Sequence, residues 1–140
     1  IMSKTQHITF KLVNIEVLQS TLNASTININ TATLFNFNIV IEHQVDREQN
    51  YIAIIPKVEI KSEDNSSVVG THAAKMIFEV EDMENFIINN EVKLPSESII
   101  AMNSISISTM RGLMFATFKG THLHNAFLPI VDPKAFTSEK

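Results

Sequence analysis

The most regular stretch of the sequence is Leu34–His43, which reads LFNFNIVIEH. Every second residue within it is large and apolar: Phe35, Phe37, Ile39 and Ile41. The residues between them are mostly polar, so the stretch has a period of two. This pattern predicts an antiparallel strand with one face on a core and the other in water.

Three further stretches predict strands in the same way: Ile8–Val17, Tyr51–Lys61 and Thr71–Glu81. In the first, the alternation slips at Val13–Asn14, which is typical of a β-bulge. Pro56 has no N–H to donate to a ladder, which favours an edge strand or a bulge for the second. Polar turns separate the strands, so we expect a four-stranded antiparallel meander.

The chain changes character after these strands. Leu94–Glu97 is a typical helix entry, with a proline, a serine that can cap and an early carboxylate. An apolar stripe at helical spacing follows, and it contains Ile100, Asn103, Ile107, Met110 and Met114. The segment 104–108 also alternates like a strand, but the longer stretch fits a period of 3.6 better, so we predict a helix.

The predicted helix ends at Gly120, a usual stop signal. Beyond it, Pro129 and Pro133 favour an extended path. Residues 1–140 are therefore expected to form one α+β domain: a four-stranded antiparallel sheet, a long helix and an extended C-terminal segment.

Composition excludes several classes of protein. The net charge is −4 and only Arg47 and Arg111 are arginines, so the clustered basic face of a nucleic-acid-binding protein is absent. There is no cysteine, which excludes disulfides and thiolate sites. The most apolar long stretch, 99–118, contains Asn103 and Arg111, so no membrane insertion is expected. No secretory signal is evident, and we expect a cytoplasmic protein.

No catalytic constellation is evident. His122 and His124 form an H-x-H pair, but no third ligand stands at a recognisable spacing, so two solvent-facing histidines are the better interpretation. The acidic run from Glu79 to Glu84 is better explained as a solvated strand face and turn. No G-x-S-x-G motif or glycine-rich phosphate loop is present. We expect neither an enzyme, nor a metal site, nor a cofactor.

The apolar helix stripe exceeds what one face of a single sheet requires. Surplus apolar helix surface indicates oligomerisation or a groove for other chains. The predicted oligomer interface is Ile100, Ile107, Met110 and Met114. The alternative is a helix that is simply well buried in a monomer.

One C-terminal stretch resembles a known family. Lys119–Thr121 is followed by Phe127–Ile130, reading FLPI, and then by Ala135–Phe136. Together with the order of the elements, this spacing is similar to that of the SecB protein-export chaperones. Weaker matches lie in the first strand (Thr9–Phe10) and the fourth (Ile77–Phe78).

The resemblance implies a dimer of dimers in which helices pack between sheets, and grooves that hold unfolded polypeptide for delivery to the motor SecA. The segment that leaves the helix would form part of a groove wall, which gives the predicted polypeptide-binding residues: Phe118, Leu123, Phe127, Leu128 and Ile130. The alternative is that these residues anchor the C-terminal segment to the core.

Two departures from the family put docking to SecA in doubt. The acidic positions used for docking align with Gln19, Asn23 and Thr71, none of them charged. The second C-terminal helix and the acidic tail are missing or reduced to residues 133–140. SecB-like chaperones dedicated to one client, such as an antitoxin, would need no SecA site.

The leading hypothesis is therefore a SecB-like chaperone that binds unfolded or nascent polypeptide, either general or client-specific. The alternative is a small hydrophobic ligand carrier with a pocket between sheet and helix. An enzyme that uses the histidines comes third.

Overall fold

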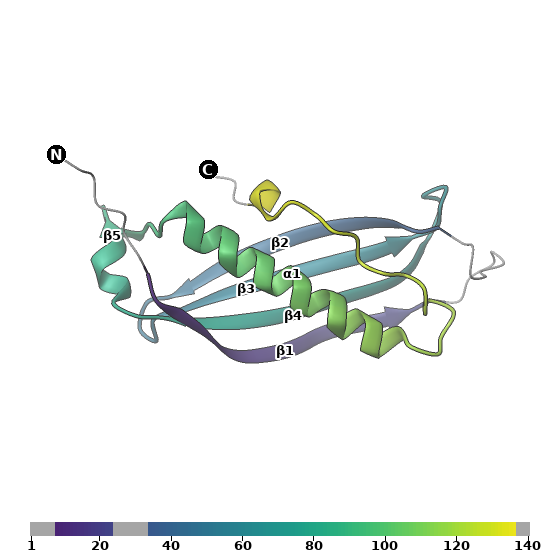
Figure 1. Cartoon of the computed structure of the whole chain (residues 1–140), viewed down its shortest axis with the longest axis horizontal. Coiled ribbons are helices and arrows are strands. Elements are labelled where there is room, and N and C mark those ends of the chain that lie inside the picture. Colours follow the sequence, from purple (N-terminus) through teal and green to yellow (C-terminus); the bar gives the residue numbers. More distant parts are fainter. Residues whose placement is uncertain (1–7, 24–33, 137–140) are drawn as a thin grey trace.

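The computed structural model describes residues 8–23 and 34–136. It contains one four-stranded antiparallel sheet with a long helix across one face (Figure 1). The strands are β1 (Phe10–Leu22), β2 (Asn36–Asp46), β3 (Tyr51–Lys61) and β4 (Val68–Val80). The predicted fold class, an α+β chain with a four-stranded antiparallel sheet, a long helix and a C-terminal segment, is confirmed.

The strand order is β1-β4-β3-β2, so the predicted meander is wrong. β2, β3 and β4 follow one another as hairpins, but β1 pairs with β4 at the far edge. The pairing places Leu12 opposite Phe78 and Ile15 opposite Met76. Such long-range apolar pairs decide the order of strands, and local periodicity carries no signal for them.

The predicted bulge in the first strand is confirmed. The register of β1 against β4 shifts between Leu12 and Asn14, and a second shift lies between Val17 and Gln19. Pro56 does not mark an edge, because β3 pairs on both sides. The pairs with β4 stop at Ile54 and resume at Lys57 in unchanged register, so the strand passes the proline without a bulge.

The helix α1 runs from Ser96 to Phe118, which confirms the helical interpretation of residues 104–108. Before it lie a short 3₁₀ turn, η1 (Met83–Phe86), and a small hairpin of β5 (Ile87–Ile88) and β6 (Glu91–Val92). After it comes a second 3₁₀ turn, η2 (Pro133–Phe136).

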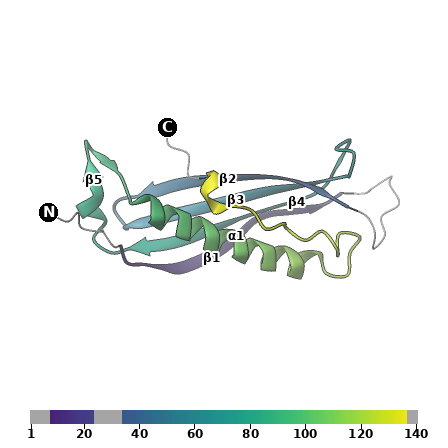
Figure 2. The ribbon, with the colours of Figure 1, turned by 45° about the horizontal axis from the view of Figure 1, so that its top comes forward.

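The core lies between α1 and the sheet. β3 and β4 contribute alternate residues that are almost fully buried: Ile52, Ile54, Val58, Ile60, Ala74, Met76, Phe78 and Val80. The side of α1 that faces them contributes Met102, Ile107, Met110, Met114 and Phe118. The C-terminal segment packs on the same face of the sheet, and none of the described helices lies on the opposite face (Figure 2). The four-stranded sheet and α1 share one core.

Of the described helices, α1 alone is long and apolar enough to cross a membrane, with a mean hydropathy of 1.2. The core helix of a soluble protein passes the same test. The buried face of α1 carries Asn103 and Ser106 and lies against the sheet, which is the arrangement of a core helix.

Candidate functional site

The C-terminal segment leaves α1 through a tight turn and returns along the helix. The hydroxyl of Thr121 donates to the Phe118 carbonyl (2.7 Å) and accepts from the N–H of Leu123 (3.1 Å). Gly120 takes a positive φ of 81° in this turn, a conformation that favours glycine. The chain then runs back past Arg111, whose Nε donates to the carbonyl of Leu128 (2.9 Å).

Three of the predicted polypeptide-binding residues are buried. Phe118, Leu123 and Leu128 are at most 3% exposed and belong to the core. Leu123 packs so closely on Gly70 of β4 that a Cβ there would lie 2.5 Å from its Cδ1. A client would reach these three side chains only if the C-terminal segment moved.

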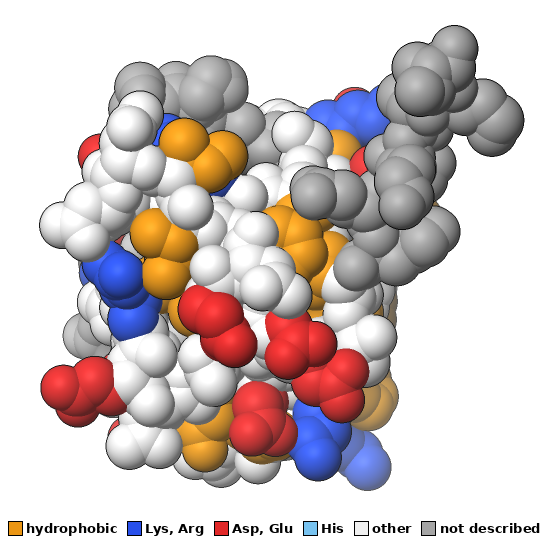
Figure 3. Space-filling model, turned by 90° about the vertical axis from the view of Figure 1, so that its left-hand side faces the viewer, with side chains coloured by type: hydrophobic (Ala, Val, Ile, Leu, Met, Phe, Trp, Pro, Cys, Tyr) orange, Lys and Arg blue, Asp and Glu red, His pale blue; other side chains and the backbone are white. Residues whose placement is uncertain are grey.

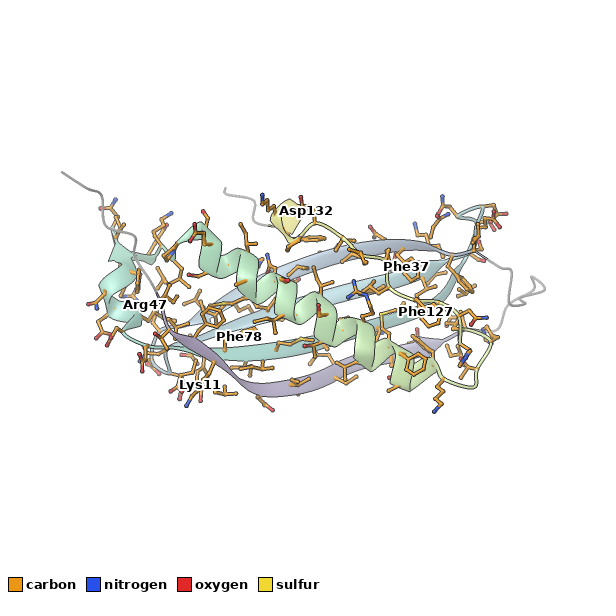
Figure 4. The ribbon with its side chains drawn as sticks, in the orientation of Figure 1. Lys11, Phe37, Arg47, Phe78, Phe127 and Asp132 are labelled. Atoms are coloured by element: carbon orange, nitrogen blue, oxygen red, sulfur yellow. The ribbon has the colours of Figure 1, made fainter. Side chains whose placement is uncertain are left out.

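The other two predicted polypeptide-binding residues are exposed. Phe127 is 54% exposed and Ile130 is 93% exposed. The ring of Phe127 stacks on the ring of Phe115 at a centroid distance of 6.2 Å. Figure 4 shows Phe127 on the C-terminal segment beside the last turns of α1. Phe115, itself 45% exposed, was missed by sequence reasoning because it falls outside the apolar stripe.

Three of the four residues predicted as an oligomer interface belong to the chain's own core. Ile107, Met110 and Met114 are at most 4% exposed, and Ile100 is half-buried. The stripe is therefore used within one chain, and an interface through it stays a prediction. A second copy would meet these side chains only if the helix separated from the sheet.

Another apolar surface lies along β1. Six of its large side chains are 38–49% exposed: Leu12, Val13, Ile15, Val17, Leu18 and Leu22. Ile15 and Val17 lie opposite Met76 and Ala74, which face α1 and are fully buried. The helix packs chiefly on β3, β4 and η2, so the helix-side face of β1 is left open. Among the described residues, β1 pairs on one side only.

A set of polar side chains is buried beneath α1. The Oδ1 of Asn103 lies 2.8 Å from Nε2 of His43 on β2. Nδ2 of Asn103, Oγ of Ser106 and Nδ1 of His72 are buried, and none has a partner among the described residues. His72 is fully buried on β4, where its ring meets the edge of Phe118 at 6.0 Å. Burial lowers the pKa of His72 below its ordinary value of 6.5.

This burial predicts a loss of stability in acid. The unfolded chain takes up a proton on His72 as the pH falls below about 6.5, whereas the folded chain resists protonation, so the unfolded state gains. Urea unfolding of the wild type should show a free energy of unfolding that falls from pH 7.5 to pH 5.5. His72→Gln should show a smaller fall, and an equal fall in both proteins would contradict the assignment.

The paired histidines do not converge. Nδ1 of His124 accepts from the N–H of Gly120 (3.2 Å), whereas Nε2 of His122 lies 3.1 Å from the carbonyl of Asn23. Within residues 8–23 and 34–136, no group of three or more His, Cys, Asp or Glu side chains is placed to hold a metal ion.

Acidic side chains gather at the end of the molecule seen in Figure 3. This end includes η1 and the neighbouring turn, where Glu81, Asp82 and Glu84 are exposed. Glu79 forms an open ion pair with Lys11 at 3.6 Å. These contacts are those of a solvated surface.

The open face of the sheet is slightly hollowed, with a volume of about 620 Å³. The hollow has mixed chemistry, since Leu18 and Val40 lie beside an ion pair of Lys57 and Glu42 (2.9 Å). Gln19 and Thr71, two of the three positions aligned with SecA docking, line it. The third, Asn23, uses its amide to donate to the Val68 carbonyl (2.9 Å).

Comparison with known proteins is informative at the level of fold. No family model and no curated protein matches the sequence. Among solved structures, the Mycobacterium tuberculosis SecB-like chaperone Rv1957, in complex with a ChAD peptide from the antitoxin HigA1, superposes with a TM-score of 0.58. The match covers 87% of this chain and 90% of that one, at 9% sequence identity. The chain has a SecB-like fold.

The SecB-like fold agrees with the C-terminal resemblance, but 9% identity shows common architecture alone. A Streptococcus agalactiae protein of unknown function also matches, with a TM-score of 0.44 and 10% identity over 81% of this chain and 90% of that one. Function has to be argued from the surfaces of this chain.

Proposed function

We propose that this chain is a molecular chaperone that binds unfolded or nascent polypeptide. The observation that carries the proposal is the exposed apolar surface next to the SecB-like core: the stacked Phe115 and Phe127 with Ile130 near them in the chain, and the open face of β1. Exposed aromatic and aliphatic groups suit varied clients, because burial of apolar surface is non-directional.

The likeness to Rv1957 supports a polypeptide client, since that chaperone was solved with a peptide from an antitoxin. A client-specific role of this kind, or a role in export, would be exercised in the cytoplasm. Docking to SecA is not part of the proposal, because Gln19, Asn23 and Thr71 supply no charge.

The ligand-carrier alternative is less well supported. A carrier needs a cavity between sheet and helix, and that space is occupied by Met102, Met110, Met114 and Phe78, each at most 1% exposed. The hollow described above lies on the other face of the sheet and is open to solvent.

Self-association is the second part of the proposal. β1 is a 13-residue edge strand with exposed apolar side chains, and such an edge is a template for pairing with another chain. We infer that a second copy pairs along β1 about a two-fold axis, with the open helix-side face buried between the copies. A dimer of dimers built from such pairs is a further expectation.

An aggregation assay tests the client surface. The double variant Phe115→Ser with Phe127→Ser is expected to protect a heat-denatured client from aggregation several-fold less well, because two exposed rings lose their apolar contact with the client. Light scattering measures the aggregation. The chain should keep its thermal stability, since both side chains are about half exposed. Leu128→Ala is unsuitable here, because removing a buried leucine costs about 2–5 kcal/mol of stability.

The matched control is Ile88→Ser. Ile88 is 56% exposed and lies in β5, at the opposite end of the molecule from the end of α1 (Figure 1). It should protect the client as well as the wild type does. Equal protection by the double phenylalanine variant would remove this surface from the proposal.

A further inference from the structure

The backbone of residues 128–131 is held in an unusual way. Arg111 donates from Nε to the carbonyl of Leu128 and from Nη2 to the carbonyl of Pro129, both at 2.9 Å. The N–H groups of Leu128, Ile130 and Val131 have no hydrogen-bond partner among the described residues. This stretch therefore belongs to no sheet and no helix, and one guanidinium carries its polar contacts.

In this stretch, side chains three positions apart pack on the core, and a side chain between them is in water. Leu128 is 3% exposed, Val131 is half-buried and both pack on the core cluster, whereas Ile130 between them is 93% exposed. Pro129 lies in the extended part of this segment, and Pro133 begins the 3₁₀ turn η2. Phe136 then adds a third apolar contact from η2.

An extended peptide bound at this place would make the same kinds of contact. A cation that binds consecutive main-chain carbonyls recognises any sequence, because every residue has a carbonyl. Apolar contacts with the core at positions i and i+3 then select extended segments with an apolar residue at each. Nothing in the arrangement requires that the segment be part of the same chain.

We propose that residues 128–136, here called the strap, are an internal ligand occupying a site for an extended client segment, with Arg111 as the residue that binds the client main chain. The inference rests on the proposed chaperone function and names the regulation of its site. Client and strap compete, so the core surface covered by Leu128, Val131 and Phe136 becomes accessible when the strap leaves. Because the strap has no ladder of hydrogen bonds, it opens more easily than the strands beneath it.

The test weakens the strap without touching Arg111. In the full chain, Val131→Ser removes one apolar anchor, which raises the fraction of open site and therefore the affinity for a client, by roughly five- to tenfold. The probe is a carboxymethylated, permanently unfolded polypeptide carrying a fluorophore, titrated by anisotropy. Ala135→Ser is the matched control within the strap and should leave affinity unchanged, because its side chain is exposed. Val131→Ala, a milder substitution, should also raise the affinity for the client.

A second readout follows the strap itself. The chain has no cysteine, so Ala135→Cys, exposed on η2, takes a single spin label, and adding the unfolded polypeptide should increase the mobility of that label. Client binding with unchanged label mobility, or Val131 variants that bind no more tightly than the wild type, would overturn the strap while leaving the chaperone function standing. A wild-type chain that binds no unfolded polypeptide would overturn both.

Discussion

Ile107→Glu is expected to unfold the chain. Ile107 is 4% exposed and lies in the core between α1 and the sheet. A carboxylate there has no cation to pair with, and an uncompensated buried charge costs about 3–5 kcal/mol. That is a large part of the stability of a domain of this size. Circular dichroism during urea unfolding measures the loss.

The control for this substitution is the next residue along. Ser108 is exposed, so Ser108→Glu should leave the unfolding midpoint nearly unchanged. The helix-interface hypothesis makes a different prediction for Ile107→Glu, namely a folded monomer. A variant that is folded, stable and dissociated would show that the stripe meets another chain and not its own sheet.

Ile15→Lys with Val17→Lys is expected to abolish self-association while leaving each chain folded. The two side chains are 42% and 49% exposed on β1, so in one chain lysines there remain solvated. In a pair of chains joined along β1, four lysines would face each other in an apolar interface. The expected loss of affinity is at least a hundredfold, or about 2.7 kcal/mol. Sedimentation at micromolar concentration measures it.

Val45→Lys is the matched control, since Val45 is 47% exposed on the helix-side face of the other edge strand, opposite Ile52. It should sediment like the wild type. A double variant on β1 that remains associated would place the interface elsewhere.

The elements were predictable from the sequence because each depends on local pattern. The alternation in Leu34–His43 and the stripe through Met110 and Met114 report which face of each element is buried, and the structure confirms both. The slip at Val13 predicted the bulge for the same reason.

What sequence reasoning missed depends on contacts distant in sequence. The place of β1 beside β4 follows from pairs separated by more than fifty positions, such as Leu12 with Phe78. The expectation of an edge strand or a bulge at Pro56 was wrong, because its missing N–H interrupts the pairs with β4 at one point only. The β5–β6 hairpin had a usable signal, since Asn89 and Asn90 take the two positive φ values that its turn requires.

The candidate site was predicted only in part. The C-terminal segment was singled out, but its sequence does not reveal which side chains face inward. Which side chains face inward depends on Arg111, seventeen residues before Leu128. The hydrogen bonds of Arg111 to the segment fix the path of the segment's backbone. Leu123 is likewise buried because Gly70 on β4 has no side chain and leaves room for it. No local pattern reveals this contact.

Chaperone function is measured most directly by a binding titration that presents one client polypeptide in two states. The fluorescent polypeptide is used either native and folded or reduced and carboxymethylated, so that sequence and label are the same. The unfolded form should bind saturably at micromolar or lower concentration, and the folded form at least tenfold more weakly, because only the unfolded chain offers extended apolar segments. Equal affinity for the two states, or no binding of the unfolded form, would contradict the proposed function.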